Sequence, residues 1–458
     1  MNLVADLLCL LACLTLVTCD RVYVHPFNLF SFNESDCEKL EKLVQEGKTV
    51  VPVSIESQTT PEYEGGMNDN ELEAPSLSTW GEKERSYLSD LVYVLGMRFY
   101  SALQEAQRGQ NVLLSPTSLY SSLVSFYLGA SNQTALDLQS LLGFVPPSGN
   151  PDCTSTAVGS NFLSSLRTIE RLVKSGDKEL LFSKTLSLFC APGIALFQLF
   201  MEHLLPSADA FYARAVDFAN PGEAVKQINA FVEAKGEGQS EALLADMDPS
   251  AQLLFAVDRG NQQAFLLKEP QEFWVDSDTK ALVPMLSITG TFRYQTDASG
   301  AFSAVEVPLS RTALLVLLQP VGGSDLEHLE SQESLQTSAW LQHLAPREIK
   351  LKLPALTLED SSDLQELLAD MKMPALLGKG ADFSKISNDS LTVGKVINKA
   401  FFKLASDGTD QPEDPAAQKE DGVYLDVTLN KPFLFAVFEK QSRAMLFLGR
   451  VVNPLHED

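Results

Sequence analysis

The sequence predicts an α+β fold, and three observations lead to that prediction. Apolar residues recur at helical spacing in segments that start near Leu88 and Ser115. Strand-like apolar runs then gather in the second half of the chain, among them residues 313–318 and 433–438. The chain has 458 residues, 45% of them hydrophobic, so it can bury a large core. Helices early and strands late indicate large antiparallel sheets in one domain spanning residues 86–458.

The first predicted helix follows from the spacing of Leu88, Val92, Leu95 and Phe99. Residues three and four positions apart lie on the same side of a helix, so these four form one apolar face. An amphipathic helix of this kind needs a core to lie on.

Two further helices are marked by their first residues. Ser115 supplies an N-cap, Pro116 suits the first helical position, and Gly129 ends the apolar pattern that follows. Ser362 and Gln365 have the spacing of a capping box, with another helical face behind them.

The predicted strands differ in how they are buried. Residues 313–318 are continuously apolar, which is typical of a strand buried on both faces. Residues 349–353 alternate with period two, so one face is expected to meet solvent. Residues 433–438 and 444–452 are expected to form a hairpin across residues 439–443.

The charge excludes one class of partner. Lys and Arg number 35 against 60 Asp and Glu, a formal net charge of −25. Nucleic acids and anionic membranes attract basic clusters, which this sequence lacks. It also lacks the G-x-S-x-G, H-E-x-x-H and P-loop motifs, and its histidines are scattered. We therefore expect no enzyme activity, no catalytic residue, no cofactor and no metal site, and a monomer without a membrane-inserted segment.

The N-terminus has the features of a secretory signal peptide. Residues 7–17 are almost continuously apolar, and 11 residues are too few to span a bilayer. The compact residues up to Cys19 precede polar Asp20, so signal peptidase is expected to cut between them and remove residues 1–19. A buried N-terminal helix is the weaker alternative because the run has no polar face. The chain is expected to be secreted into the extracellular fluid.

Removal of that segment leaves three of the six cysteines. Cys190 lies in an apolar strand-like run and is expected to be an inert buried thiol. By elimination, Cys37–Cys153 is the candidate disulfide.

Three N-x-[ST] sequons begin at Asn33, Asn132 and Asn388 and fit a secreted glycoprotein. Residues 30–85 show no sustained periodicity and contain several prolines and many acids, which predicts a flexible tail.

Several motifs in order resemble the serpin family. They are Asn111-Val112-Leu113-Leu114-Ser115-Pro116, Val283-Pro284-Met285, Leu353-Pro354, Ala381-Asp382-Phe383-Ser384, Asn430-Lys431-Pro432-Phe433 and Leu448-Gly449-Arg450-Val451-Val452-Asn453-Pro454. The resemblance covers nearly everything after the tail. It implies the serpin fold, with three β-sheets surrounded by about nine helices, and it raises protease inhibition as a function.

The expected reactive loop argues against inhibition. An inhibitory serpin inserts the hinge of this loop into a sheet as a strand, and the hinge therefore needs free backbone donors and small residues. Gly408 and Thr409 resemble the hinge, but Pro412 and Pro415 remove donors, and Glu413 is costly to bury unpaired. We expect a non-inhibitory serpin, with an inhibitor of a serine protease as the alternative.

Residues 20–29, DRVYVHPFNL, follow the predicted signal peptide directly and are similar to the angiotensin family of vasoactive peptide hormones. Asn28 stands where mammalian members have histidine, which points to a non-mammalian form. Without the resemblance, these residues would read as an ordinary disordered tail.

The resemblance implies a processing scheme with three partners. Renin, an aspartic protease, would cut between Leu29 and Phe30, and the angiotensin-converting peptidyl-dipeptidase would then cut between Phe27 and Asn28. The octapeptide of residues 20–27 would bind a G-protein-coupled angiotensin receptor and regulate blood pressure and salt and fluid balance.

The chemistry of the segment fits this scheme. Aspartic proteases bind extended substrates with apolar residues on both sides of the cut bond, and Pro26 biases the residue before it toward an extended conformation. Arg21, Tyr23, His25 and Phe27 offer the cationic and aromatic anchors that dominate small interfaces. The chain is thus expected to be a hormone precursor and renin substrate, in which a serpin body presents and shields residues 20–29.

Overall fold

The structure is a computed structural model that describes most of the serpin-like body and parts of the N-terminal region. The described residues are 22–24, 31–33, 47–59, 65–66, 82–143, 151–175, 181–235, 242–264, 267–297, 300–321, 325–332, 335, 341, 343–405 and 424–455.

Eight α-helices occur in the described part of the chain, against the nine or so expected. They are α3 Glu82–Ala106, α4 Pro116–Gly129, α5 Asn132–Leu142, α6 Pro151–Ser175, α7 Gln198–Leu204, α8 Pro221–Lys235, α9 Leu326–Glu330 and α10 Leu364–Asp370, with a short 3₁₀ helix at Leu205–Ser207.

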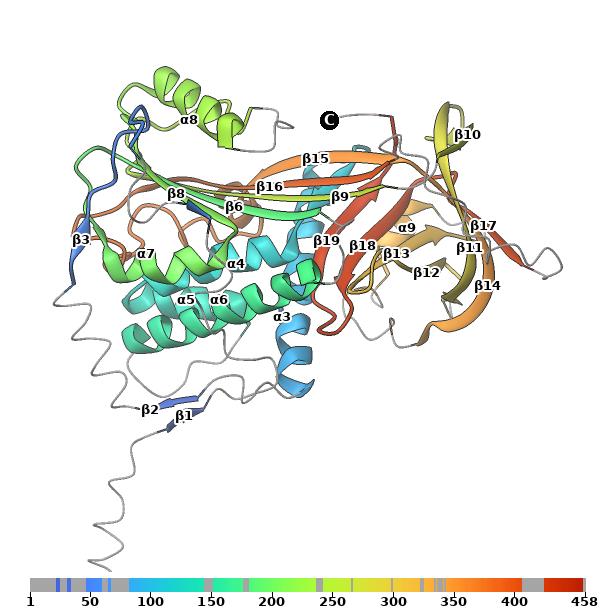
Figure 1. Cartoon of the computed structure of the whole chain (residues 1–458), viewed down its shortest axis with the longest axis horizontal. Coiled ribbons are helices and arrows are strands. Elements are labelled where there is room, and N and C mark those ends of the chain that lie inside the picture. Colours follow the sequence, from blue (N-terminus) through green and yellow to red (C-terminus); the bar gives the residue numbers. More distant parts are fainter. Residues whose placement is uncertain are drawn as a thin grey trace, which may run out of the picture.

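Six strands form the sheet in the order β15-β16-β9-β6-β8-β4. They are β4 Gly65–Gly66, β6 Leu181–Cys190, β8 Ala210–Ala215, β9 Leu253–Ala264, β15 Leu356–Asp363 and β16 Val393–Ala405. Helix α8 lies on one face of this sheet, and α4, α5, α6 and α7 lie on the other (Figure 1).

Nine strands form a second, connected sheet in the order β17-β14-β11-β12-β13-β18-β19-β5, with β10 paired to β11. They are β5 Val112–Leu114, β10 Leu267–Trp274, β11 Lys280–Thr296, β12 Phe302–Pro308, β13 Ala313–Pro320, β14 Ala345–Pro354, β17 Leu425–Thr428, β18 Phe433–Glu439 and β19 Met445–Val451.

Strand β11 divides the nine-stranded sheet into two parts. Most of its length pairs with β10 and β14, whereas only its last residues, Arg293 to Thr296, pair with β12. Counted this way, the body has three sheets, and the predicted α+β serpin fold is confirmed.

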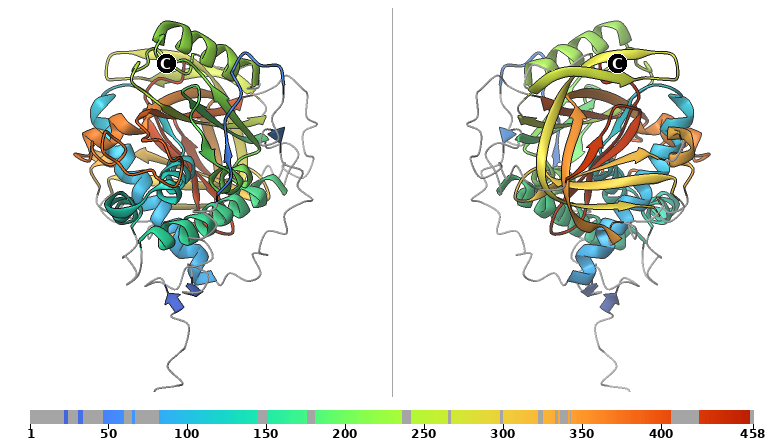
Figure 2. Two further views of the ribbon diagram at one scale, coloured as in Figure 1. Left: turned by 90° about the vertical axis from the view of Figure 1, so that its left-hand side faces the viewer. Right: turned by 90° about the vertical axis from the view of Figure 1, so that its right-hand side faces the viewer.

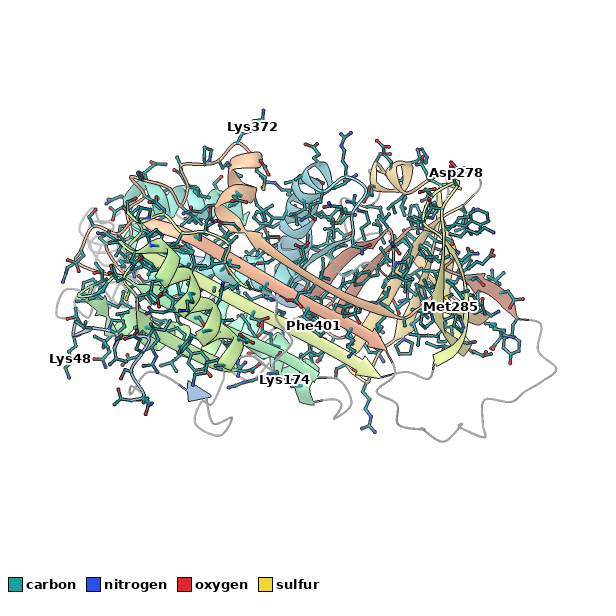
Figure 3. The ribbon with its side chains drawn as sticks, turned by 90° about the horizontal axis from the view of Figure 1, so that it is seen from above. Lys48, Lys174, Asp278, Met285, Lys372 and Phe401 are labelled. Carbon is teal, nitrogen blue, oxygen red and sulfur yellow. The ribbon has the colours of Figure 1, made fainter. Side chains whose placement is uncertain are left out.

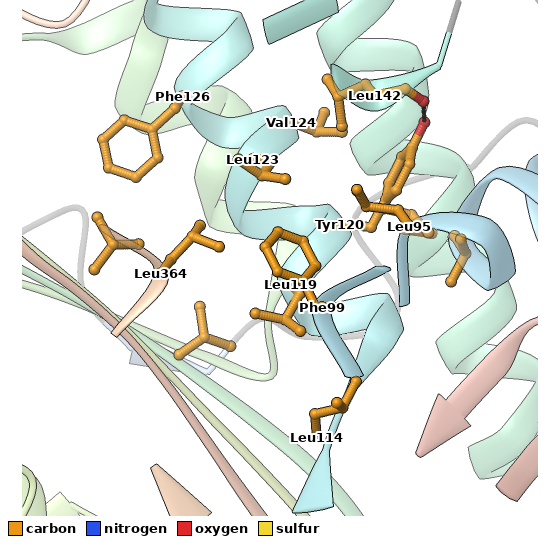
Figure 4. Close-up of a cluster of buried hydrophobic side chains, with 14 of the residues drawn as sticks. Leu95, Phe99, Leu114, Leu119, Tyr120, Leu123, Val124, Phe126, Leu142 and Leu364 are labelled. Carbon is orange, nitrogen blue, oxygen red and sulfur yellow. Dashed lines mark hydrogen bonds between the residues drawn. The ribbon is translucent and has the colours of Figure 1, made fainter. Parts of the chain in front are cut away.

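The main core lies between the helices and the six-stranded sheet. Figure 4 shows α4 contributing Leu119, Leu123 and Phe126 to it, each at most 2% exposed. The Tyr120 hydroxyl donates a hydrogen bond to the Leu142 carbonyl at 3.1 Å, which ties α4 to the end of α5. Burying that phenol without a partner would be costly, so the hydrogen bond is part of why it can lie in the core.

Most predicted elements are confirmed. Ser115 caps α4, and its side chain accepts a hydrogen bond from the Ser118 N–H. In β14, Ile349, Leu351 and Leu353 are buried while Lys350 is exposed. Gly449 has a packing reason, because a Cβ there would lie 2.4 Å from the Phe435 ring.

The predicted cap of α10 is wrong by one residue. Asp363 is the N-cap, since its carboxylate accepts a hydrogen bond from the Gln365 N–H at 3.0 Å. Strand β15 runs through both Ser362 and Asp363, which pair with Asn398 and Ile397 of β16, so the helix begins only at Leu364. Pairing in the sheet, which sequence spacing does not reveal, moved the start of the helix.

Candidate functional site

The predicted hormone segment forms one strand of a small hairpin. Strands β1, Val22–Val24, and β2, Ser31–Asn33, pair antiparallel, with Val22 opposite Asn33 and Val24 opposite Ser31. Figure 2 shows this pair beyond the lower end of α3, on the helical side of the body. The predicted cleavage bond, between Leu29 and Phe30, lies in the connection between the two strands, outside the described residues.

This pairing bears on access to the cleavage bond. Strand β2 begins one residue after Phe30, so the second, third and fourth residues after the predicted cut already have a β partner. A protease that binds its substrate as an extended strand competes for the same backbone groups. The β1–β2 hairpin therefore has to open at least partly before those residues can lie in such a cleft.

The second half of the predicted disulfide lies in helix α6. Cys153 is disulfide-bonded and only 1% exposed. Its predicted partner, Cys37, lies outside the described residues.

Helix α6 is a firm anchor for such a bond because its other end is pinned by buried ion pairs. Glu170 lies 3.3 Å from the Lys184 ammonium of β6 and 2.9 Å from the Arg259 guanidinium of β9, and all three side chains are at most 2% exposed. Burial lowers the pKa of Lys184, and the negative charge of Glu170 opposes that effect. Removing Glu170 would leave two buried cations without their carboxylate, which is strongly destabilising.

A part of the predicted tail lies along the body instead of hanging free. Strand β3, Thr49–Val50, pairs with β7, Leu196–Phe197. The Ala215 N–H donates to the Val53 carbonyl at 2.8 Å, and the Ile55 N–H donates to the Ala215 carbonyl at 2.9 Å.

Sequence reasoning missed this docking. Residues 49–53 carry three valines, which favour strands, but the partner lies about 150 residues further along the chain. Together with β4, the docked segment covers β8, the outermost long strand of the six-stranded sheet. An uncovered strand edge invites aggregation, so this contact protects the body.

The central strands of the same sheet are fully closed. Strands β16 and β9 pair in parallel over twelve residue pairs, from Val393 opposite Leu253 to Ala405 opposite Ala264. Figure 3, viewed onto this sheet, shows the long strands side by side and labels Phe401 on β16. The expected reactive loop, with Gly408, Pro412 and Pro415, lies outside the described residues.

Two of the three predicted sequons lie in described parts of the body. Asn132 and Asn388 are exposed. The Asn132 amide donates to Asp382 at 2.8 Å, and the Thr134 hydroxyl accepts from the Asp382 N–H at 2.8 Å. An amide linked to a sugar keeps one N–H, so a glycan at Asn132 is compatible with this contact. Asn33 lies in β2.

Cys190 is a buried free thiol, as predicted. Burial raises its pKa to about 12, so the reactive thiolate is scarce at neutral pH.

Of the predicted peptide anchors, Tyr23 alone lies among the described residues. Tyr23 lies in β1, whereas the other predicted site residues of the N-terminus lie outside the described residues: Cys19, Asp20, Arg21, His25, Phe27, Asn28, Leu29 and Phe30. No described helix is long and apolar enough to cross a membrane. Within the same ranges, no group of three His, Cys, Asp or Glu side chains is arranged to hold a metal ion.

Comparisons with known proteins separate the body from the tail. Residues 91–454 match the family model described as Serpin (serine protease inhibitor). Angiotensinogen from Homo sapiens is 38% identical over 99% of this chain and 98% of its own length, and that from Bos taurus is 40% identical with the same coverage. Plasma serine protease inhibitor from Bos taurus is 27% identical and covers 83% of this chain and 92% of its own.

Solved structures show the same fold at lower identity. Human thyroxine-binding globulin complexed with thyroxine has a TM-score of 0.70 and 20% identity, covering 81% of this chain and all of its own. Uncleaved ovalbumin has a TM-score of 0.68 and 20% identity, covering 80% of this chain and all of its own. The chain belongs to the serpin family and, within it, to the group that contains the angiotensinogens.

Proposed function

We propose that this chain is a secreted precursor of angiotensin-type peptides and a substrate of renin, not an enzyme. Renin would cut between Leu29 and Phe30 and release residues 20–29. Signal peptidase would first remove residues 1–19, which leaves Asp20 as the N-terminus of both the precursor and the hormone.

The observation that carries this proposal is the coverage of the N-terminal region. Similarity to the human angiotensinogen covers 99% of this chain, whereas similarity to the plasma serine protease inhibitor of Bos taurus covers 83% of it. The serpin family model likewise begins only at residue 91. The chain therefore shares with the angiotensinogens a region that serpins in general do not require.

The later steps follow the same scheme. A peptidyl-dipeptidase would remove Asn28 and Leu29, and the resulting octapeptide, residues 20–27, would act as a vasoactive hormone. Arg21, Tyr23, His25 and Phe27 would be the side chains read by its G-protein-coupled receptor, since cationic and aromatic groups supply most of the binding energy in small interfaces.

The body would regulate how easily renin reaches its bond. The β1–β2 hairpin occupies backbone groups next to the cut, and a Cys37–Cys153 disulfide would hold the chain seven residues after Phe30 against helix α6. Reduction of that bond should lengthen the free segment and speed cleavage.

Inhibition of serine proteases is disfavoured by the composition of the expected reactive loop. Loop insertion would have to separate the twelve pairs between β16 and β9 and then place Pro412 and Pro415 in the centre of the sheet. Proline lacks the N–H that a central strand needs, so the inserted strand would lack hydrogen bonds to its neighbours at these two positions.

One experiment separates a precursor from an inhibitor. The secreted chain is incubated with renin and, separately, with a panel of trypsin-like and chymotrypsin-like proteases, followed by mass spectrometry and denaturing gels. We expect release of residues 20–29 by renin and no covalent protease complex. A covalent complex without release of the decapeptide would reverse the assignment. A Leu29→Lys variant is the control, because a charged residue beside the cut should block renin and leave the gel pattern unchanged.

A further inference from the structure

A cavity of about 780 Å³ lies at the end of the body where α3 finishes, and none of the described residues that line it belongs to the N-terminal region. Its walls come from the C-terminal end of α3, the β10–β11 turn, α9, and the residues that flank β18 and β19. Figure 3 labels Asp278 in the β10–β11 turn, in which Asp276 and Ser277 line the cavity. Cavities of 300–1,000 Å³ are typical of sites for small organic ligands.

The floor of the cavity is rigid and buried. Glu330 and Arg450 form an ion pair at 3.2 Å, with side chains only 3% and 4% exposed. The Gln104 amide donates to Glu330 at 2.7 Å, and the Arg450 guanidinium donates to the Gln107 and Gln110 carbonyls. Because each charge has its partners, the floor is neutral and preorganised.

The walls are largely apolar. Trp274, Leu326, Pro432 and Val452 all line the space. The backbone N–H of Trp274 donates a hydrogen bond to the Asn430 carbonyl at 2.8 Å, which fixes the β10–β11 turn against the segment before β18. A ligand with an aromatic or aliphatic body would bury its surface here.

The rim is negative on balance. Outside the Glu330–Arg450 pair, the lining carries four carboxylates and two cations. The carboxylates are Glu105, Asp276, Asp325 and Glu327, and the cations are Arg108 and Lys431. Glu105 and Glu327 are exposed, and neither carboxylate has a hydrogen bond or ion pair with any residue in the described ranges. The whole chain has a formal net charge of −25, so its electrostatic field also favours cations over anions.

Trp274 already binds a cation on its ring. The Lys280 ammonium lies 3.9 Å from the ring centroid. The Lys280 ammonium is also paired with Glu272 at 2.7 Å, so this contact adds no net positive charge beside the aromatic wall.

We propose that this cavity binds a small amphipathic amine, with its apolar body against Trp274 and Leu326 and its ammonium group at Glu105 and Glu327. The site is separate from the hormone segment, so it stands or falls independently of the precursor function.

The test compares two probes of the same shape and opposite charge. Naphthylethylamine and naphthylacetate are titrated into the full secreted chain by calorimetry at neutral pH. We expect one amine bound per chain, at least about tenfold more tightly than the acid. Equal or tighter binding of the acid, or no binding of either probe at millimolar concentration, would overturn the proposal.

Variants locate the binding. The double variant Glu105→Gln/Glu327→Gln is expected to weaken amine binding at least about fivefold, whereas Glu233→Gln, an exposed position on α8, should leave it unchanged. Leu326→Arg should abolish binding, because it places a guanidinium in the cavity, where it repels the ammonium group of the amine. The melting temperature of this variant is measured to establish that it folds. An unchanged affinity in the double variant would show that the amine binds elsewhere.

Discussion

Two pairs of strands in this molecule are held very differently. The β1–β2 hairpin, which carries the predicted hormone segment, has three residue pairs, whereas β16 and β9 in the centre of the body have twelve. A two-stranded hairpin is at best marginally stable, whereas long strands in the middle of a large sheet open far less readily. The strand pair beside the predicted cut is thus weakly held, whereas the strand pair between which an inhibitory loop would insert has four times as many residue pairs.

The largest expected effect comes from the paired strands β16 and β9. Phe402 of β16 is completely buried and stacks on Phe435 of β18 with ring centroids 4.7 Å apart. Phe402→Ala should lower the free energy of unfolding by about 3–5 kcal/mol, because it removes apolar contacts and leaves a cavity.

Its neighbour is the matched control. Phe401 lies on the opposite face of the same strand and is only half-buried, so Phe401→Ala should cost much less. Denaturant unfolding measures both. Below the unfolding transition, neither variant should change the rate at which renin cuts the chain, and a changed rate would mean that the two regions are coupled.

The tether should have the next largest effect. Loss of the predicted bridge through Cys153→Ser is expected to raise the renin cleavage rate about tenfold, which corresponds to about 1.4 kcal/mol of restraint. Cys37→Ser and the double variant should give the same rate, and Cys190→Ser the wild-type rate. Additive effects of Cys37→Ser and Cys153→Ser in the double variant would show that the two residues are not bonded to each other.

Weakening the hairpin itself should have a smaller effect. Val22→Gly lies far from the cut bond and lowers strand preference by up to about 1 kcal/mol, so cleavage of the full chain should speed up by about threefold. Synthetic peptides of residues 20–33 with and without the change should be cut at equal rates, because the hairpin does not persist alone. A slower full-length variant, or an equal difference in the peptides, would exclude hairpin opening as the reason.

The smallest effect is expected for a cut in the reactive loop. A nick within residues 406–423 should leave the melting temperature within a few degrees of the intact chain, because Pro412 and Pro415 lack the backbone N–H groups that an inserted central strand needs. Calorimetry before and after limited proteolysis measures this. A large rise in the melting temperature would show that the loop inserts after all.

Local signals predicted much of the body. Ser115 and Pro116 mark the start of α4, and the alternation of Ile349, Leu351 and Leu353 marks β14, because caps and periodicity depend only on neighbouring residues. Local signals of this kind do not predict long-range pairing. The contact of Val53 with Ala215 and the move of the α10 cap to Asp363 both depend on partners far along the chain.

The candidate site was predictable in one part only. The family resemblance predicts a hormone segment at residues 20–29, but nothing in the spacing of Val22, Tyr23 and Val24 indicates that they pair with residues 31–33. The cavity above Glu330 and Arg450 was likewise invisible, since its walls come from segments scattered over some 350 positions.

The most direct test of the central claim is the N-terminal sequence of the large fragment that renin leaves. The account predicts a single new N-terminus that reads Phe30-Ser31-Phe32, with the released peptide beginning at Asp20. A cut at any other bond, or an intact chain under conditions in which a synthetic peptide of residues 20–33 is cut, would contradict it.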